Sequence, residues 1–102
     1  FGYPPYSHII RFTLRHSDYE LLRRAAHVLS SHLRARFAQR VMGPVSAALE
    51  MLRGEHRAEI LLKIESGASL KLARAHIRQA LDEMRNDKSV KMVTITTDVD
   101  AL

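Results

Sequence analysis

The stretch IIRFTLRHSDYELLRRAAHVLSSHLRARF, residues 9–37, decides the fold, because its apolar residues change their spacing part-way along it. In the first part Ile10, Phe12 and Leu14 alternate with polar residues, and this period of two is typical of a strand with one buried face. From Leu22 onward the apolar residues follow the spacing of an amphipathic helix. The stretch therefore predicts a strand that leads directly into a helix.

A capping box marks the predicted start of this helix. The hydroxyl of Ser17 and the carboxylate of Glu20 can satisfy the first free backbone amides of a helix. The apolar stripe that follows predicts a helix running to about Phe37. Its members are Leu22, Ala25, Ala26, Leu29, Leu33 and Phe37.

Toward the C-terminus, residues 41–52 predict a strand with a bend. Gly43 and Pro44 interrupt its apolar run, and a proline within a strand suits a bulge or an edge position. Residues 53–55 predict a turn, and every second residue from Ile60 to Ile64 is apolar. The two strands together predict a long β-hairpin.

The remaining residues predict one more helix and one more strand. Residues 66–69 break the preceding strand, and Ser69 is a candidate N-cap for an apolar stripe that runs from Leu70 to Met84. Asn86 ends the predicted helix. The valines, isoleucine and threonines of residues 90–99 favour a final strand.

The predicted element order is βαββαβ, in one domain that spans residues 1–102. The two halves of this order place both helices on one face of a four-stranded antiparallel sheet. The sequence therefore predicts an α+β fold of the ferredoxin-like kind.

Composition narrows the functional classes. The chain has 102 residues, with 16 lysines and arginines against 11 acidic residues, and its pI is about 10.1. This balance favours a polyanionic partner, although a basic surface can also serve solubility alone. The absence of cysteine excludes disulfides and suits a reducing cytoplasm. No apolar run approaches the roughly 20 residues that a membrane crossing needs, so we expect no membrane association.

No motif indicates catalysis or metal binding. The glycines at positions 2, 43, 54 and 67 are scattered, and none precedes a Lys-Ser or Lys-Thr pair, so no phosphate-cradling loop is present. His27 and His32 lie five residues apart, whereas histidine pairs that bind metal on a helix lie four apart. Asp82 and Glu83 are interpreted as part of a solvated helix face. We expect no catalytic residue, cofactor or metal in this chain.

The predicted hairpin carries the richest polar cluster. Arg53, Arg57 and Lys63 could place cationic groups on phosphate oxygens. Alternatively, these cations could pair with the nearby acidic residues, and the sequence leaves the two interpretations about even. The acidic residues are Glu50, Glu55, Glu59 and Glu65.

The first helix supplies a second basic strip, which we interpret as a solvated face because charged outer faces are usual on helices. Its members are Arg23, Arg24, Arg34, Arg36 and Arg40. A four-stranded sheet of this topology could also bind RNA, but such sheets use exposed aromatic residues on their central strands, and these strands have none.

Five short segments carry a family resemblance, and they occur in a characteristic order. They are Tyr3-Pro4-Pro5-Tyr6, Val41-Met42-Gly43-Pro44, Arg53-Gly54 with Arg57, Ile60-Leu61-Leu62-Lys63 and Asp98-Val99-Asp100. Together they resemble the C-terminal domain of the PriA family of primosomal replication-restart helicases, over essentially the whole chain. The resemblance implies that residues 1–6 are a linker from the helicase core. The chain begins at Phe1 without an initiator methionine, and we expect it to be a fragment.

The resemblance also implies the properties of a longer parent protein. That parent would be a superfamily-two helicase that unwinds DNA in the 3′-to-5′ direction with ATP and magnesium, and would carry zinc, all in other domains. For this domain it implies contact with branched DNA, with the acidic tail of the single-strand DNA-binding protein, and with the rest of the helicase and primosome.

The leading hypothesis is therefore a non-catalytic module that binds DNA and docks proteins. Its expected phosphate contacts are Arg53, Arg57 and Lys63, with Lys71 and Arg74 as weaker candidates. A purely structural domain that braces the helicase core is the alternative. An enzyme of ferredoxin-like fold is a distant third, because the sequence indicates no polar pocket.

Overall fold

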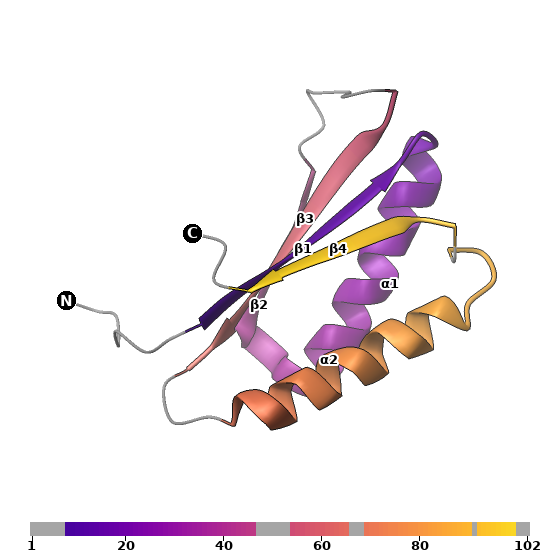
Figure 1. Ribbon diagram of the computed structural model, residues 1–102. Coiled ribbons are helices and arrows are strands. Elements are labelled where there is room, and N and C mark those ends of the chain that lie inside the picture. Colours follow the sequence, from indigo (N-terminus) through magenta and orange to yellow (C-terminus); the bar gives the residue numbers. More distant parts are fainter. Residues whose placement is uncertain (1–7, 47–53, 66–68, 91, 100–102) are drawn as a thin grey trace.

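A computed structural model describes residues 8–46, 54–65, 69–90 and 92–99 (Figure 1). The elements follow the predicted βαββαβ order, with one short 3₁₀ helix, η1, inserted after the first α-helix. They are β1 (His8–His16), α1 (Tyr19–Phe37), η1 (Ala38–Arg40), β2 (Val41–Ser46), β3 (His56–Ile64), α2 (Leu70–Arg85) and β4 (Thr94–Val99). The expected α+β class is confirmed.

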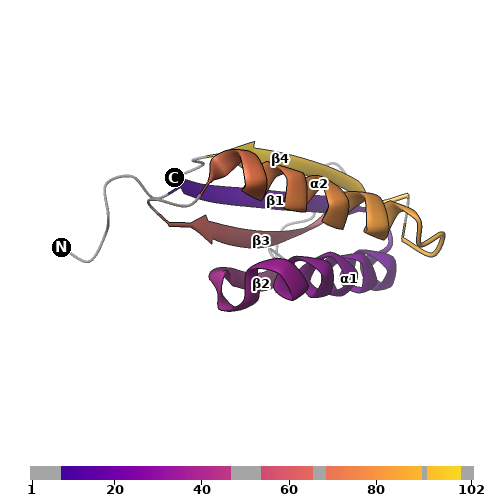
Figure 2. The same cartoon turned by 90° about the horizontal axis from the view of Figure 1, so that it is seen from below.

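The four strands form one antiparallel sheet in the order β2-β3-β1-β4. Strand β1 lies inside the sheet and pairs with β3 on one side and with β4 on the other. Both helices pack on the same face of the sheet (Figure 2). This arrangement is the predicted ferredoxin-like sandwich, and none of the described helices covers the opposite face of the sheet.

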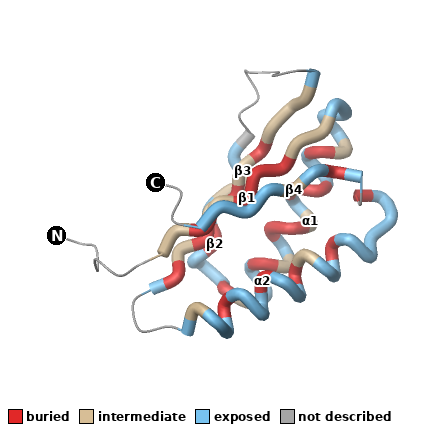
Figure 3. Tube along the Cα trace, viewed as in Figure 1, coloured by how far each residue is buried: buried red, intermediate tan, exposed pale blue. Residues whose placement is uncertain are grey.

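The alternation seen in the sequence places the core between sheet and helices. Ile10, Phe12 and Leu14 of β1 are each at most 1% exposed, and α1 presents the predicted apolar stripe to them. Full burial of a side chain such as that of Phe12 stabilises the fold by roughly 1.5–3 kcal/mol. In Figure 3 the buried segments accordingly lie where sheet and helices face one another.

The N-cap of α1 differs from the prediction. Asp18, not Ser17, caps the helix, and its Oδ1 accepts hydrogen bonds from the amides of Glu20 and Leu21 at 3.0 and 3.2 Å. The Glu20 carboxylate accepts from Arg23. Asparagine, aspartate and serine cap helices equally well, so the position at which β1 ends decides which of them serves.

The bend in β2 is confirmed as a β-bulge on an edge strand. The pairing of β2 with β3 shifts between Met42 and Val45, across Gly43 and Pro44. Gly43 has a φ of +103°, and a Cβ there would lie 2.9 Å from the backbone oxygen of Glu59. The remainder of the predicted strand, 47–52, lies outside the described residues.

The last strand is shorter than predicted. It begins at Thr94 rather than Val90, because turn hydrogen bonds use the preceding backbone: the Val90 amide donates to Asp87 and the Val93 amide to Val90. Both valines are buried, so they pack into the core from a turn instead of a strand.

The predicted cap of α2 by Ser69 is confirmed, because the Ser69 side chain accepts a hydrogen bond from the Leu72 amide.

Candidate nucleic-acid interface

The uncovered face of the sheet is the natural place to look for a binding surface. Successive side chains of a strand point to opposite faces, and the buried residues of β1 and β3 face the helices. The other set forms what we call the open face. On β1 and β3 it comprises Ile9, Arg11, Thr13, Arg15, Arg57, Glu59, Leu61 and Lys63.

Two of the predicted phosphate contacts lie on the open face. Arg57 and Lys63 are half-buried residues of β3, six positions apart on the same side of the strand. Arg53, the third hairpin candidate, lies outside the described residues. The structure therefore places Arg57 and Lys63 on one surface and leaves the position of Arg53 open.

Sequence reasoning missed the partner of Arg57 on this surface. Arg15 of β1 stands directly opposite Arg57 in the sheet register. Cβ atoms of such directly opposed residues are about 4.5–5.5 Å apart, so the two arginine side chains start side by side. The alternation of β1 already put Arg15 on the polar face, but only the strand register reveals that the two cations meet.

Arg11 of β1 has an acidic residue on each of its two neighbouring strands. Its Nε lies 4.0 Å from Oε1 of Glu59, and Asp98 of β4 is its direct partner in the register. The half-exposed carboxylate of Glu59 is thus directed to Arg11. We conclude that these carboxylates reduce the net positive charge that Arg11 contributes to the open face.

The alternative interpretation, in which the hairpin cations pair with nearby acidic residues, is not seen for Arg57 or Lys63 among the described residues. Glu59 and Glu65 do make ion pairs, but with Arg11 and with Arg40 at 3.5 Å rather than with the hairpin cations. Within the described part of the chain, Arg57 and Lys63 have no ion-pair partner. Glu50 is outside the described residues.

The remainder of the open face is aliphatic or hydroxylated. Met42 and Val45 of β2 are 45% and 66% exposed, and Leu61 lies next to them on β3. Thr13 and Thr96 pair across β1 and β4. None of the described residues on this face is aromatic, so it offers hydroxyl and guanidinium groups rather than stacking platforms for bases.

The weaker candidates lie elsewhere. Lys71 and Arg74 are exposed on α2, which is in the helix layer on the opposite side of the sheet. There they line a shallow hollow of about 500 Å³. Of the five predicted contacts, the structure therefore places two on the open face and two on α2, and Arg53 lies outside the described residues.

Most cations of α1 are bound within the domain. Arg23 pairs with Glu20 at 3.3 Å, and Arg34 donates to the hydroxyl of Ser30 at 2.7 Å and to the carbonyl of Gly43. Partners inside the molecule satisfy these guanidinium groups. This arrangement favours the interpretation of the α1 strip as structural.

The two helices are joined by a polar cluster that the sequence did not indicate. Arg36 of α1 donates to the carboxylate of Glu83 and, at 2.8 Å, to the side chain of Gln79, both on α2. His32 lies 3.3 Å from the other Glu83 oxygen. The Arg36 hydrogen bond is the main cause that lowers the pKa of Glu83. Glu83 therefore links the helices, although it lies on the exposed helix face that the sequence predicts.

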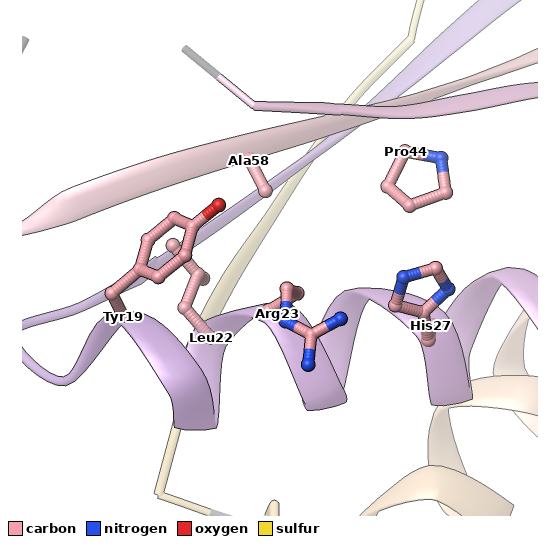
Figure 4. A pocket seen from close by; sticks show the side chains of 6 residues that line it. All are labelled: Tyr19, Leu22, Arg23, His27, Pro44 and Ala58. Carbon is pink, nitrogen blue, oxygen red and sulfur yellow. The ribbon is translucent and has the colours of Figure 1, made fainter. Parts of the chain in front are cut away.

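A small hollow lies between α1 and the β2–β3 hairpin (Figure 4). It measures about 220 Å³, with Tyr19 at one end and His27 at the other. Leu22, Pro44 and Ala58 make most of its lining apolar. The only guanidinium in that lining belongs to Arg23, which Glu20 already engages.

The described residues contain no cluster of three or more potential metal-binding side chains. Among the same residues, no helix has both the length and the apolar character to cross a membrane.

Comparisons with known proteins bear on the family and on the fold. A family model described as the primosomal protein N C-terminal domain matches residues 1–102, the whole chain. No curated protein matches the sequence. Among solved structures, the chain is similar to the de novo designed protein Foldit4. The TM-score is 0.65, the identity 12%, and the match covers 94% of this chain and 98% of that chain. At that identity the likeness supports the fold alone.

Proposed function

We propose that this chain, which belongs to the primosomal protein N C-terminal domain family, binds the sugar-phosphate backbone of branched DNA with the open face of its sheet. Membership supports a role in DNA replication restart, and DNA and replication proteins are the partners that this role would require. The proposal assigns the DNA contact to Arg57, Lys63 and the newly recognised Arg15.

The opposed pair Arg15 and Arg57 is the observation that carries the proposal. Like charges directly opposite in a sheet destabilise it by roughly 0.2–1 kcal/mol. No carboxylate of the described residues forms an ion pair with either arginine. A phosphate between the two guanidinium groups would remove this repulsion, and it would accept charge-assisted hydrogen bonds from both.

The neighbouring side chains also fit a backbone contact. Thr94 of β4 is exposed and stands directly opposite the half-buried Arg15, and threonine hydroxyls are common ligands of DNA phosphates. Glu59 and Asp98 lie between the Arg15 and Arg57 pair and Lys63, so the three cations would contact phosphates at the two ends of the open face. The absence of aromatic rings among the described open-face residues favours recognition of the backbone over recognition of bases.

The remaining parts of the function belong to the longer parent protein. We propose that the parent is an ATP-dependent 3′-to-5′ DNA helicase of the cytoplasm, with ATP, magnesium and zinc bound by other domains. Arg53 would extend the DNA contact from the hairpin turn. The exposed cations of α2, including Lys71 and Arg74, would serve docking of the acidic tail of the single-strand DNA-binding protein and of primosome partners.

Fluorescence anisotropy of the domain with labelled forked, duplex and single-stranded DNA tests the proposal. Three phosphate contacts predict that log affinity falls with log salt at a slope of about −2.7, so affinity drops roughly forty-fold between 50 and 200 mM salt. Arg57→Gln should reduce the slope by about 0.9 and weaken all sequences equally. Arg23→Gln removes the same charge from the α1 side and should leave the slope unchanged.

The alternative is a brace for the helicase core that does not touch DNA. It predicts no salt-dependent binding of any of the three DNAs, even at 50 mM salt. An Arg57→Gln protein with the wild-type slope would likewise rule out the assigned contact. Stronger binding to forked than to duplex DNA would favour a junction-binding role.

A further inference from the structure

A groove runs between α2 and the edge strand β4, on the helix side of the sheet. It has a volume of about 340 Å³, and Ile10, Ile77, Leu81 and Val99 form an apolar floor. That volume lies near the lower end, roughly 300 Å³, of pockets that hold a small ligand. The groove can therefore accept an apolar side chain.

Three arginines of α2 border this floor. They are Arg74, Arg78 and Arg85, and Asp82 is the single acidic residue of the lining. Within the described residues none of the three arginines has a hydrogen-bond or ion-pair partner, in contrast to Arg23, Arg34 and Arg36 of α1. The groove thus combines an apolar floor with positive charge that the domain itself does not neutralise.

The other wall of the groove is an open strand edge. Within the described sheet β4 pairs only with β1, so its outer backbone amides and carbonyls have no strand partner. Residues of β4 are exposed along almost its whole length, and Val99 is 45% exposed (Figure 3). An edge of this kind is a template for pairing with another extended chain.

We propose that this groove, called here the β4 groove, binds an extended acidic peptide that adds as a fifth strand beside β4. The peptide places one aliphatic side chain on the apolar floor and carboxylates against Arg74, Arg78 and Arg85. This proposal deepens the protein-docking part of the proposed function, because it names the surface, the chemistry of the partner and the mode of binding. It does not depend on DNA binding at the open face.

The spacing of the arginines fits such a strand. Arg74 and Arg78 are one helical step of four residues apart, a rise of about 6 Å. Residues i and i+2 of a strand, which point to the same side, are about 6.7 Å apart. In a strand of the pattern Asp-x-Ile-x-Asp the two aspartates are about 13 Å apart. This interval lies between the helical rises of about 10.5 Å from Arg78 to Arg85 and about 16.5 Å from Arg74 to Arg85.

A peptide explains the floor of the groove better than a nucleic acid does. Phosphodiester backbones are charged at every nucleotide. Burying them against isoleucine and leucine side chains would cost desolvation free energy that no hydrogen bond or ion pair offsets. An aliphatic side chain removes apolar surface from water at the same place. Charge and floor together select an acidic chain with an apolar anchor.

The probe is the labelled peptide Thr-Asp-Thr-Ile-Thr-Asp-Thr, whose isoleucine and two aspartates share one side of a strand. We expect saturable binding to the wild-type domain by anisotropy at 50 mM salt. Arg78→Gln should weaken it about three- to tenfold, because one charge-assisted contact is lost. Val99→Asp, which places a negative charge on the floor, should abolish it. Arg23→Gln, on the opposite side of the domain, should bind like wild type.

A second measurement tests the mode of binding. Hydrogen exchange followed by NMR should show slower exchange of the β4 amides that point away from β1 when the peptide is bound. Circular dichroism of each variant establishes that a loss of binding is not a loss of fold.

Three results would overturn the proposal. Equal affinity for a peptide with lysine in place of aspartate would remove the charge argument, and unchanged β4 exchange would remove strand addition. If Arg78→Gln instead weakened binding of forked DNA and left the peptide unaffected, the β4 groove would be a nucleic-acid surface. Weaker DNA binding by Arg57→Gln with intact peptide binding would support the β4 groove as a site separate from the open face.

Discussion

Removing the charge of Arg15 should make the domain more stable. Arg15 stands opposite Arg57, and its Nε is buried without a hydrogen-bond partner. Arg15→Met keeps an apolar stem, relieves a repulsion of roughly 0.2–1 kcal/mol, and removes a buried donor that costs about 1–3 kcal/mol when it lacks a partner. We therefore expect a gain of about 1 kcal/mol or more, or about 4–8 °C in Tm.

The companion variant Arg57→Met separates the two contributions. It relieves only the repulsion, so its gain should be smaller than that of Arg15→Met. The double variant should gain less than the two single changes combined, since one repulsion can be removed only once. Arg78→Met is the control, because Arg78 is exposed on α2 and has no ion-pair partner among the described residues, and it should change stability by less than about 0.5 kcal/mol.

Urea unfolding followed by circular dichroism gives the four free energies at 50 mM and at 1 M salt. High salt should shrink the gain of Arg57→Met, because at 1 M the Debye length is only about 3 Å. If both single variants are less stable than wild type, the packing of the arginine stems outweighs their repulsion. The argument for a phosphate between them would then lose its physical basis.

Three further predictions concern the scaffold. Glu83→Gln should destabilise the domain at pH 7, because the Arg36 hydrogen bond lowers the Glu83 pKa from its ordinary 4.5. The stabilisation by the Glu83 carboxylate is present above pH 4.5 and is lost as pH falls through the lowered pKa of the folded state. The difference in free energy of unfolding between wild type and Glu83→Gln, measured with urea, should therefore be smaller at pH 3 than at pH 7. Gly43→Ala should cost at least about 1–3 kcal/mol, because its φ is positive and its Cβ would meet the Glu59 carbonyl, and thermal unfolding would measure this. Asp18→Ala should cost about 1 kcal/mol in the same assay through loss of the α1 cap.

Local patterns predicted the elements and their order because each element carries its own period. The alternation of Ile10, Phe12 and Leu14 and the stripe along α1 bury the expected side chains. The predicted boundaries of the elements were less accurate where neighbouring residues could play the same structural role. Serine and aspartate at positions 17 and 18 both cap helices well, and valine at positions 90 and 93 is apolar whether it lies in a strand or in a turn.

The candidate site could be predicted only in part, because it depends on pairing between segments distant in the sequence. Arg57 and Lys63 were found from their positions near the hairpin, but Arg15 required the register of β1 against β3. Likewise, the sequence could not say that Glu59 faces Arg11 rather than a hairpin cation. A pattern along one strand assigns a face, whereas the identity of a cross-strand neighbour follows from tertiary structure.

The distribution of free cations argues that the domain has two binding surfaces and not one. Arg23, Arg34 and Arg36 of α1 are satisfied internally. In contrast, Arg15 and Arg57 of the open face and the three arginines of the β4 groove lie on opposite sides of the sheet and lack ion-pair partners within the described residues. Bound DNA should therefore leave the peptide site physically open. We expect saturating forked DNA to change the affinity of the acidic peptide by less than about threefold, since the added negative charge acts across the domain and is screened beyond about 10 Å at 0.1 M salt. Displacement of the peptide by DNA, measured by anisotropy of the labelled peptide, would mean that both anions compete for a single surface.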